Sequence, residues 1–322
     1  MKAYVYDANG AAIADVPKPS PAGTQILVKV HACGLNRADV GMSKGHAHGA
    51  SGGAGTVLGM EWAGEVAELG PNATKVKIGD RVMGTSGGGF AEFALTDHGR
   101  VFPIPASMKY DEAATLPLAL TTMHNALVTN GALQAGQSVL IQGASSGVGL
   151  MALQIAKHKG AKLVIGSSTN AERRARLKEF GADLAIDSSD DGWVDQVLKA
   201  TDGKGVDLIV DQVSGKTVNG NLAATKVQGR IVNVGRLGGT HGDFNFDLHA
   251  ARRINYIGVT FRTRSMEEIR DIFANVRSDI WPAVESRKLK LPIDKVFPFA
   301  EIGAAFARME ANQHLGKIVV TF

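Results

Sequence analysis

The chain has 322 residues, of which 44% are hydrophobic and 20% are charged, and it carries a formal net charge of +4. This composition excludes a disordered or fibrous chain and is typical of a globular protein with room for two domains. The basic residues are scattered, so charge alone predicts no nucleic-acid partner. The single cysteine, Cys33, excludes an intramolecular disulfide and a cysteine-rich zinc lobe.

The sequence contains no run of 18 apolar residues and no basic-then-apolar leader. Internal repeats and a low-complexity tail are not seen either. We therefore expect a cytoplasmic protein that is not secreted and has no membrane partner.

The first 118 residues predict strands joined by turns. Residues 25–32 and much of 64–69 alternate between apolar and polar side chains, as half-buried strands do. Residues 79–84 predict a turn that enters another strand. The glycines at positions 45, 49, 52, 53 and 55 mark a loop that we expect to be mobile.

From about residue 119 the pattern changes to helices that alternate with strands. Strands joined by single helices imply a parallel sheet with right-handed crossovers. The expected elements are a helix over 113–131, a strand over 138–142, a helix over 148–159, a strand over 162–166, a helix over 171–180, a strand over 184–187, a helix over 192–201, a strand over 206–211, a helix over 215–226 and a strand over 229–234.

Beyond about residue 258 this alternation ends. We expect helices over 267–287 and 299–310 and a final strand over 316–322. The chain is thus predicted to be an α/β protein in which a nucleotide domain is inserted into a mainly-β domain, with reactants bound in the cleft between the two. The predicted segments are 1–118, 119–258 and 259–322.

The strand over 138–142 leads into a turn rich in glycine and serine and then into a helix. Free N–H groups at the start of such a helix bind a pyrophosphate, and glycines let the backbone approach it closely. The alternative is an ordinary turn from strand to helix. The predicted cofactor-binding residues of the turn are Gly143, Ala144, Ser145, Ser146, Gly147, Val148 and Gly149.

Ser167 and Ser168 follow the next predicted strand, and we include them in the cofactor site. A site for NAD carries an acidic residue about 20 positions after the turn, where it bonds the ribose 2′-hydroxyl. No acid stands here, and Arg173 and Arg174 come next. Because the paired N–H donors of arginine suit a phosphate, we predict NADPH as the cofactor, with Arg173 on its 2′-phosphate. Alternatively, both arginines lie on a solvated helix face.

Seven short motifs follow one another along the chain: ACGLNRAD (32–39), LGMEWAG (58–64), GDRV (79–82), GFAEF (89–93), ASSGVG (144–149), DKVFP (294–298) and HLGKIV (314–319). In this order they resemble the zinc-free, zeta-crystallin-like quinone oxidoreductases of the medium-chain dehydrogenase/reductase superfamily. The resemblance implies a Rossmann-type nucleotide domain inserted in a GroES-like catalytic domain. It also implies hydride transfer from NADPH to a quinone or a related electron-poor carbonyl.

Zinc-containing members of this superfamily have a cysteine ligand where this chain has Asn36, and a histidine ligand where it has Met60. An amide and a thioether replace thiolate and imidazole ligands poorly. We therefore expect no metal site, and the oxidation of simple alcohols, which needs a Lewis acid, is disfavoured. The next residue, Glu61, is expected to pair with an arginine.

The turn also resembles that of the short-chain dehydrogenases. Those proteins carry the turn near the N-terminus and use a Tyr-x-x-x-Lys pair for catalysis. Here the turn follows roughly 140 residues, and none of the four tyrosines has a lysine four positions on. The short-chain alternative is therefore disfavoured.

The resemblance places two catalytic residues near the nicotinamide: Asn36, and Thr122 on the helix that opens the nucleotide domain. The alternatives are that Asn36 caps a local turn and that Thr122 bonds back to its own helix. Lys317 would bond ribose or phosphate, or else lie solvated at the start of a strand. The further predicted cofactor contacts are Val234, Gly235, Arg236, Phe261, Arg262, Gly316 and Lys317.

The proton donor is not evident from the sequence. Many relatives place a tyrosine a few residues after the asparagine, but residues 40–55 contain none. His46 and His48 lie in this loop, and histidine has a pKa suited to proton donation. A lone histidine in a loop is usually just exposed, and water is the other donor.

Two rival functions share the nucleotide motif. An enone or enoyl-thioester reductase would use the same fold and cofactor but needs a proton donor at the α-carbon. The other is a non-catalytic, crystallin-like protein that binds NADPH or RNA. The scattered basic residues speak against RNA, and the intact cofactor motif favours an enzyme. The resemblance further implies a homodimer joined through a sheet edge.

Overall fold

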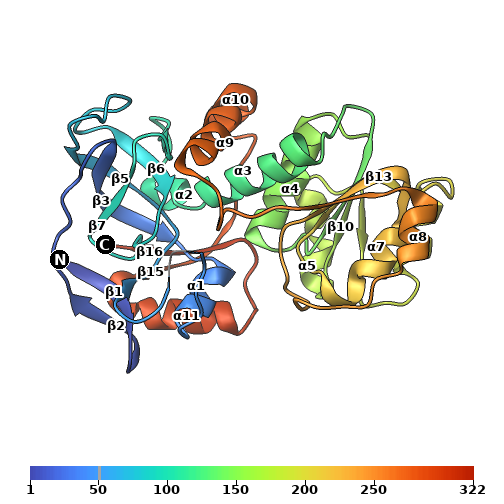
Figure 1. The fold of residues 1–322 in the computed structure, drawn as a ribbon, viewed down its shortest axis with the longest axis horizontal. Helices are drawn as coiled ribbons and strands as arrows, with labels where there is room; N and C mark the ends of the chain where they lie inside the picture. The colour runs from blue at the N-terminus through green and yellow to red at the C-terminus, as the bar shows by residue number, and fades with distance from the viewer. Residues whose placement is uncertain (50–51) are drawn as a thin grey trace. The chain divides into compact units, whose positions relative to one another are not determined.

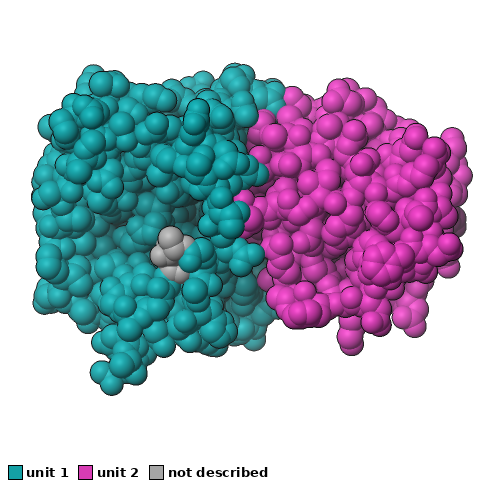
Figure 2. Space-filling model, viewed as in Figure 1, with its two compact units in different colours: residues 1–121, 261–322 teal, residues 122–260 magenta. Residues whose placement is uncertain are grey.

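The computed structural model describes residues 1–49 and 52–322. They form two compact units, shown in different colours in Figure 2. Unit 1 comprises Met1–Thr121 and Phe261–Phe322, and unit 2 comprises Thr122–Thr260. The glycine-rich loop that we expected to be mobile includes positions 50 and 51, which lie outside the described residues, so its mobility stays a prediction.

The main sheet of unit 1 has seven strands (Figure 1). Six follow the order β15-β16-β3-β5-β6-β8, and β7 pairs with β3. Only the pair β15–β16 is parallel. The bounds are β3 Gln25–Gly34, β5 Glu61–Leu69, β6 Arg81–Thr85, β7 Phe93–Asp97, β8 Val101–Pro103, β15 Ile293–Pro298 and β16 Lys317–Thr321. A smaller sheet joins β2 (Gly10–Asp15), β1 (Lys2–Asp7) and β4 (Thr56–Val57). The prediction of a mainly-β part is confirmed.

Strand β3 is more deeply buried than its alternating sequence suggested. Ile26, Leu27 and Val28 are all fully buried, and within the strand only Lys29 is exposed. Apolar residues therefore point to both faces of this strand. The core on one side includes the ring of Phe306, whose centroid lies 5.2 Å from that of Tyr4. Phe306 belongs to helix α11 (Ile302–Glu310).

The helices of unit 1 are shorter than predicted. The helix expected over 267–287 is two helices, α9 (Met266–Asp279) and α10 (Trp281–Glu285). Pro282 lies in the first turn of α10, where its missing N–H group is tolerated but where it cannot continue the preceding helix. The other helical segments are α1 Arg37–Met42, α2 Tyr110–Ala113 and the 3₁₀ turn η4 Phe299–Glu301.

The helix predicted over 113–131 is also divided. Helix α2 ends at Ala113, α3 spans Pro117–His124, and a π-helix, η1, spans Asn125–Asn130. Pro117 explains the first break, because proline disfavours helical backbone in the residue before it. The wider turn of the π-helix has no recognisable pattern in the residues 125–130.

Unit 2 contains a parallel sheet of six strands in the order β11-β10-β9-β12-β13-β14. A helix or helical turn follows each of the first five strands along the chain (Figure 1), so the predicted alternation is confirmed. The strands are β9 Ser138–Gln142, β10 Leu163–Ser167, β11 Leu184–Ile186, β12 Val206–Asp211, β13 Thr225–Asn233 and β14 Asn255–Gly258. The helices are α4 Gly147–His158, α5 Ala171–Ala175, α6 Trp193–Ala200, α7 Val218–Ala224 and α8 Phe246–Arg252.

Two predicted helices of unit 2 differ in length. The helix over 171–180 is α5 followed by a 3₁₀ turn, Leu177–Phe180, which ends at Gly181 with a φ of 100°. The helix over 215–226 shortens because β13 already begins at Thr225. Among the residues that the structure describes, no helix has the length and apolarity needed to cross a membrane.

The strand order also locates the crevice for a ligand. Strands β9 and β12 are neighbours, but the chain leaves β9 toward β10 and β11, and leaves β12 toward β13 and β14. In open α/β sheets the ligand binds at such a switch point, outside the carboxyl ends of the two strands.

Candidate active site

The turn between β9 and α4 has the backbone shape that the sequence predicted. Gly143 adopts a φ of +69°, which favours glycine. A Cβ atom on Gly149 would lie 2.6 Å from the carbonyl oxygen of Gly143. A side chain at Gly149 would therefore push the helix away from the turn.

Among the described residues, three N–H groups of the turn have no acceptor. The N–H of Gly143 donates to Ser167 Oγ at 3.0 Å, and that of Ala144 donates to the carbonyl oxygen of Ser167 at 2.8 Å. No acceptor within the described residues bonds the N–H groups of Ser145, Gly147 or Val148. Free N–H groups at the start of a helix such as the 12-residue α4 favour the binding of an anion.

Ser167 supports this turn from inside the sheet. It is fully buried, and its hydroxyl donates to Gln142 Oε1 at 2.6 Å. On the other side, Ser146 Oγ donates to Gln212 Oε1 at 3.0 Å and accepts from the N–H of Gly149. Ser167 was also predicted as a cofactor contact; in the structure its side chain is fully buried and bonds the turn, and the cofactor contact stays a prediction.

Sequence reasoning missed the two glutamines of this network. Gln142 ends β9, and Gln212 directly follows β12. The Nε2 atom of Gln212 donates to the carbonyl oxygen of Gln142 at 3.1 Å. Their positions at the carboxyl ends of neighbouring strands were the available signal.

The two arginines after β10 differ in their contacts. Arg174 Nη1 donates to the carbonyl oxygen of Ser168 and to Asp187 Oδ2, both at 2.8 Å, so this arginine is held in place. Arg173 donates its backbone N–H to Asn170 Oδ1, which caps α5. Ser168 is buried and donates from Oγ to Ser145 Oγ at 3.0 Å. Arg174 thus does not lie on a freely solvated face.

The segment after β13 approaches protein backbone closely. The N–H groups of Val234 and Gly235 both donate to the carbonyl oxygen of Asp211, at 2.7 and 3.1 Å. A Cβ atom on Gly235 would lie 2.6 Å from the carbonyl oxygen of Gln212. The backbone that leaves β12 therefore requires a glycine at position 235, independently of any cofactor. The Arg236 side chain is exposed.

In unit 1, Asn36 belongs to a buried polar cluster with Glu61 and Lys317. Glu61 is fully buried, and Lys317 is 3% exposed. The Lys317 ammonium donates to Glu61 Oε1, and to Asn36 Oδ1 at 2.9 Å. Asn36 Nδ2 in turn donates to Glu61 Oε1 at 2.9 Å, and Glu61 Oε2 accepts the N–H of Leu118 at 3.0 Å.

This cluster corrects one prediction and excludes one alternative. Glu61 pairs with Lys317 rather than with an arginine, and the burial of Lys317 excludes the alternative that it lies solvated at the start of a strand. The cause is the sheet, in which β16 lies beside β3 and brings Lys317 close to the residues that follow β3. The side chain of Asn36 is directed to Glu61 and Lys317, although the residue also stands at the N-cap of α1.

Asp39 is a buried acid next to this cluster. Its Oδ2 accepts the N–H of Asn36 at 2.8 Å, whereas no hydrogen bond reaches its Oδ1. Burial raises the pKa of Asp39 to about 7, with a further contribution from the charge of Glu61. Burial likewise raises the pKa of the Cys33 thiol, which donates to the carbonyl oxygen of Gly89 at 2.9 Å.

The remaining predicted residues lie in varied surroundings. Thr122 is half-buried, and it is Thr121 that bonds back to its helix, at 2.7 Å from the carbonyl oxygen of Pro117. Phe261 is half-buried and Arg262 exposed. Gly316 is buried with a φ of +88°.

The histidines considered as proton donors lie in unit 1. Burial lowers the pKa of His48, and the charge of Arg262 lowers it further. His46 donates its backbone N–H to the carbonyl oxygen of Gly41 at 3.0 Å. Within residues 1–49 and 52–322, no group of three or more His, Cys, Asp or Glu side chains is arranged to hold a metal ion.

Two family models match the chain. Residues 22–106 match the alcohol dehydrogenase GroES-like domain, and residues 147–276 match the model described as zinc-binding dehydrogenase. Among curated relatives, the quinone oxidoreductase of Pongo abelii is 30% identical over 90% of this chain and 87% of its own length. The low-reducing polyketide synthase drtA of Aspergillus calidoustus is 31% identical over 98% of this chain, which spans only 13% of that protein.

Solved structures agree over the whole chain. A mycobacterial protein solved as a complex with NADPH superposes with a TM-score of 0.88, at 25% identity and full coverage of both chains. The enoyl reductase CurK superposes with a TM-score of 0.87, at 27% identity and 99% coverage of both chains. The motifs, the two family models and these likenesses agree, and the chain belongs to the zinc-independent quinone oxidoreductase type of the medium-chain dehydrogenase/reductase superfamily.

Proposed function

We propose that this oxidoreductase uses NADPH to reduce a quinone or a related electron-poor carbonyl acceptor, without zinc. The observation that carries the proposal is the turn at 143–149, whose three unpartnered N–H groups suit a pyrophosphate. The similarity to quinone oxidoreductases and to a structure bound to NADPH supports it. We assign cofactor binding to residues 119–258, and the catalytic side chains of unit 1 to the segments 1–118 and 259–322.

The described residues fit the proposed cofactor. Ser145, Gly147 and Val148 would hold the pyrophosphate through their N–H groups. Arg173 would bind the 2′-phosphate, with no carboxylate at 166–170 to repel it. When bound, NADPH supplies the hydride.

Asn36 is the residue we propose to hold the acceptor. Its amide is oriented because Lys317 fixes Oδ1 and Glu61 fixes one Nδ2–H. The contact of Nδ2 with the carbonyl oxygen of Gly34 is 3.4 Å long and therefore weak. The second N–H is thus available to a carbonyl oxygen of the acceptor, which becomes more negative as it gains the hydride. The acceptor then takes its proton from water.

The alternative function is reduction of a carbon–carbon double bond in an enone or enoyl thioester. The similarity to a polyketide synthase and to an enoyl reductase structure favours it. This reaction needs an acid near the α-carbon. The lowered pKa of His48 makes that histidine a weaker source of protons at neutral pH, which favours the quinone proposal.

Oxidation of NADPH by the purified, chelator-treated protein tests the proposal. We expect turnover with a 1,4-quinone and much less with a simple enone. Turnover with the enone alone would assign the protein to the alternative reaction, and loss of quinone turnover on chelation would contradict a zinc-free mechanism. Tight NADPH binding without turnover of either acceptor would favour a non-catalytic, NADPH-binding protein.

We also propose a homodimer joined at an edge strand of the unit 2 sheet.

Arg173→Ala is expected to weaken NADPH binding by about 1.5–3 kcal/mol, the worth of a hydrogen bond to a charged group. NADH binding should not change, because NADH lacks the 2′-phosphate. Calorimetric titration of both cofactors measures the difference. Arg174→Ala is the matched control: since Arg174 holds Ser168 and Asp187, its loss should weaken both cofactors alike. Equal losses for both cofactors in Arg173→Ala would contradict the assignment.

A further inference from the structure

Unit 2 contains a pocket in the half of its sheet formed by β12, β13 and β14, whereas the glycine turn follows β9. The pocket has a volume of about 160 Å³ and lies at the exits of β12 and β13 and beside β14. The glycine turn leaves β9, which precedes these three strands in the sheet order. This volume is below the range of about 300–1,000 Å³ that is usual for ligand pockets, so only a small ligand fits. The lining residues are Ser214, Gly215, Val218, Asn233, Arg236, Thr240, His241, Gly242, Phe244 and Tyr256.

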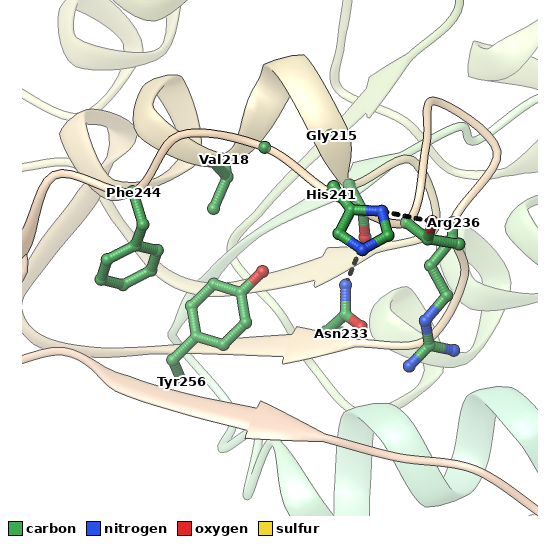
Figure 3. Close-up of a pocket in the computed structure, with 10 residues that line it drawn as sticks. Gly215, Val218, Asn233, Arg236, His241, Phe244 and Tyr256 are labelled. Atoms are coloured by element: carbon green, nitrogen blue, oxygen red, sulfur yellow. Dashed lines mark hydrogen bonds between the residues drawn. The ribbon is translucent and has the colours of Figure 1, made fainter.

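The wall of the pocket is apolar on one side and polar on the other. Figure 3 shows Phe244 and Val218 on one side, and the Asn233 amide with the His241 ring on the other. The hydroxyl of Tyr256 is directed into the space between them. Burial raises the pKa of this hydroxyl, so it stays protonated at neutral pH and can donate a hydrogen bond. A ligand that fits both sides has an apolar body and a polar end.

Two basic side chains at the rim, Arg236 and His241, have no acidic partner among the described residues. Arg236 makes one long contact, 3.3 Å, to the carbonyl oxygen of Val234, and His241 Nδ1 lies 2.9 Å from Thr240 Oγ1. The opposing charge is Asp211, which is fully buried below the floor and accepts the N–H groups of Val213 and Ser214. The charge at the pocket mouth is therefore available to an anion.

The floor carries backbone strain. Ser214 has φ 59° and ψ −155°, a region that is essentially restricted to glycine. Hydrogen bonds hold it there, since its Oγ donates to the carbonyl oxygen of Gly235 at 2.7 Å and accepts from Asn233 Nδ2. Strain of this kind persists where the surroundings enforce it and gathers at ligand sites. This observation is independent of the charges at the rim.

We propose that this pocket is a second ligand site, separate from the cofactor turn, that binds a small carboxylate with an aromatic or short apolar body. The proposal assigns Arg236, which the sequence placed among the cofactor contacts, to this ligand instead. Arg236 would bind the carboxylate with paired N–H donors, and His241 and Tyr256 would add hydrogen bonds. The body would pack on Phe244 and Val218. The proposal does not depend on which acceptor the enzyme reduces.

Calorimetric titration of the full-length protein with benzoate, in the presence of saturating NADPH, tests this site. We expect saturable binding of benzoate and at least tenfold weaker binding of benzamide, which has the same shape without the charge. Arg236→Gln and His241→Gln, both at exposed positions, should each weaken benzoate binding at least fivefold. Arg277→Gln, an exposed arginine on α9 in unit 1, is the matched control and should bind benzoate as the parent does.

Several outcomes would overturn the proposal. Absence of saturable benzoate binding, or binding that both variants retain, would show that the pocket is not the site. Competition between benzoate and NADPH would place the benzoate in the cofactor site instead. Inorganic phosphate that binds as tightly as benzoate would show that the apolar wall has no part in recognition. The NADPH oxidation assay is separate, so a failure here leaves the proposed reaction unaffected.

Discussion

Lys317→Met is expected to lower the free energy of unfolding by about 3–5 kcal/mol, as the removal of one partner from a buried ion pair does. Lys317 and Glu61 are both nearly inaccessible to solvent, and methionine would leave the Glu61 carboxylate without its cation. The hydrogen bond to Asn36 Oδ1 would be lost as well. Urea unfolding followed by circular dichroism measures the change.

Two comparisons separate the buried charge from other effects of the substitution. Lys44→Met removes an exposed lysine that pairs with Glu310 at 3.1 Å, and it should cost no more than about 1 kcal/mol. The double variant Lys317→Met/Glu61→Gln removes both charges and should recover much of the lost stability. If Lys317→Met unfolds no more easily than Lys44→Met, the pair contributes nothing beyond a surface contact.

Asp39→Asn is expected to be more stable than the parent at pH 8, and to lose this advantage as the pH falls to 4. The pKa of Asp39 is raised to about 7 in the folded protein, against about 3.9 in an unfolded chain. Below pH 4 both states hold the proton. As the pH rises through the interval from 4 to 7, the unfolded chain releases its proton first, and the parent loses about 4 kcal/mol relative to a residue that does not titrate.

The measurement compares urea unfolding of the parent and of Asp39→Asn at several values between pH 4 and pH 8. For Asp15→Asn we expect a stability difference of the opposite sign, with the variant less stable than the parent at pH 8. The reason is that a hydrogen bond from Lys2 lowers the pKa of the exposed Asp15 carboxyl. A difference between parent and Asp39→Asn that stays constant across the range would mean that Asp39 titrates normally. In that case a path to water would have to reach its Oδ1 atom.

The parts of the structure that the sequence predicted well are local. The strand β9, the turn and helix α4 occupy adjacent positions, and glycine, serine and apolar spacing mark each of them. The parallel sheet followed from the alternation of strands and helices. The break before α10 also has a local cause that the sequence shows, because Pro282 cannot continue the preceding helix.

The parts that could not be predicted depend on strands that meet far apart along the chain. Glu61 and Lys317 are separated by 256 positions, and Asn36 and Lys317 by 281. No spacing rule connects such residues, and a lysine at a strand start is usually exposed. The ion pair between Lys317 and Glu61 is apparent only from the structure, in which β16 lies beside β3. The contacts of Arg173 and Arg174 could not be predicted for the same reason. The two arginines are neighbours on a short helix, and only the folded structure shows that Arg174 bonds Asp187.

The place of β16 in the unit 1 sheet has a consequence for synthesis on the ribosome. Unit 2 is one continuous segment, whereas β16 inserts between β15 and β3 after all of unit 2 has been made. At about 5–20 residues per second, the Glu61 carboxylate would precede its lysine partner by roughly 10–50 s. During that interval β3 lacks its neighbour β16, and the Glu61 carboxylate lacks its lysine. Unit 1 therefore stays incompletely folded, or a chaperone binds it. The nascent chain is therefore expected to hold a finished unit 2 before Asn36, the residue we propose to hold the acceptor, is in position.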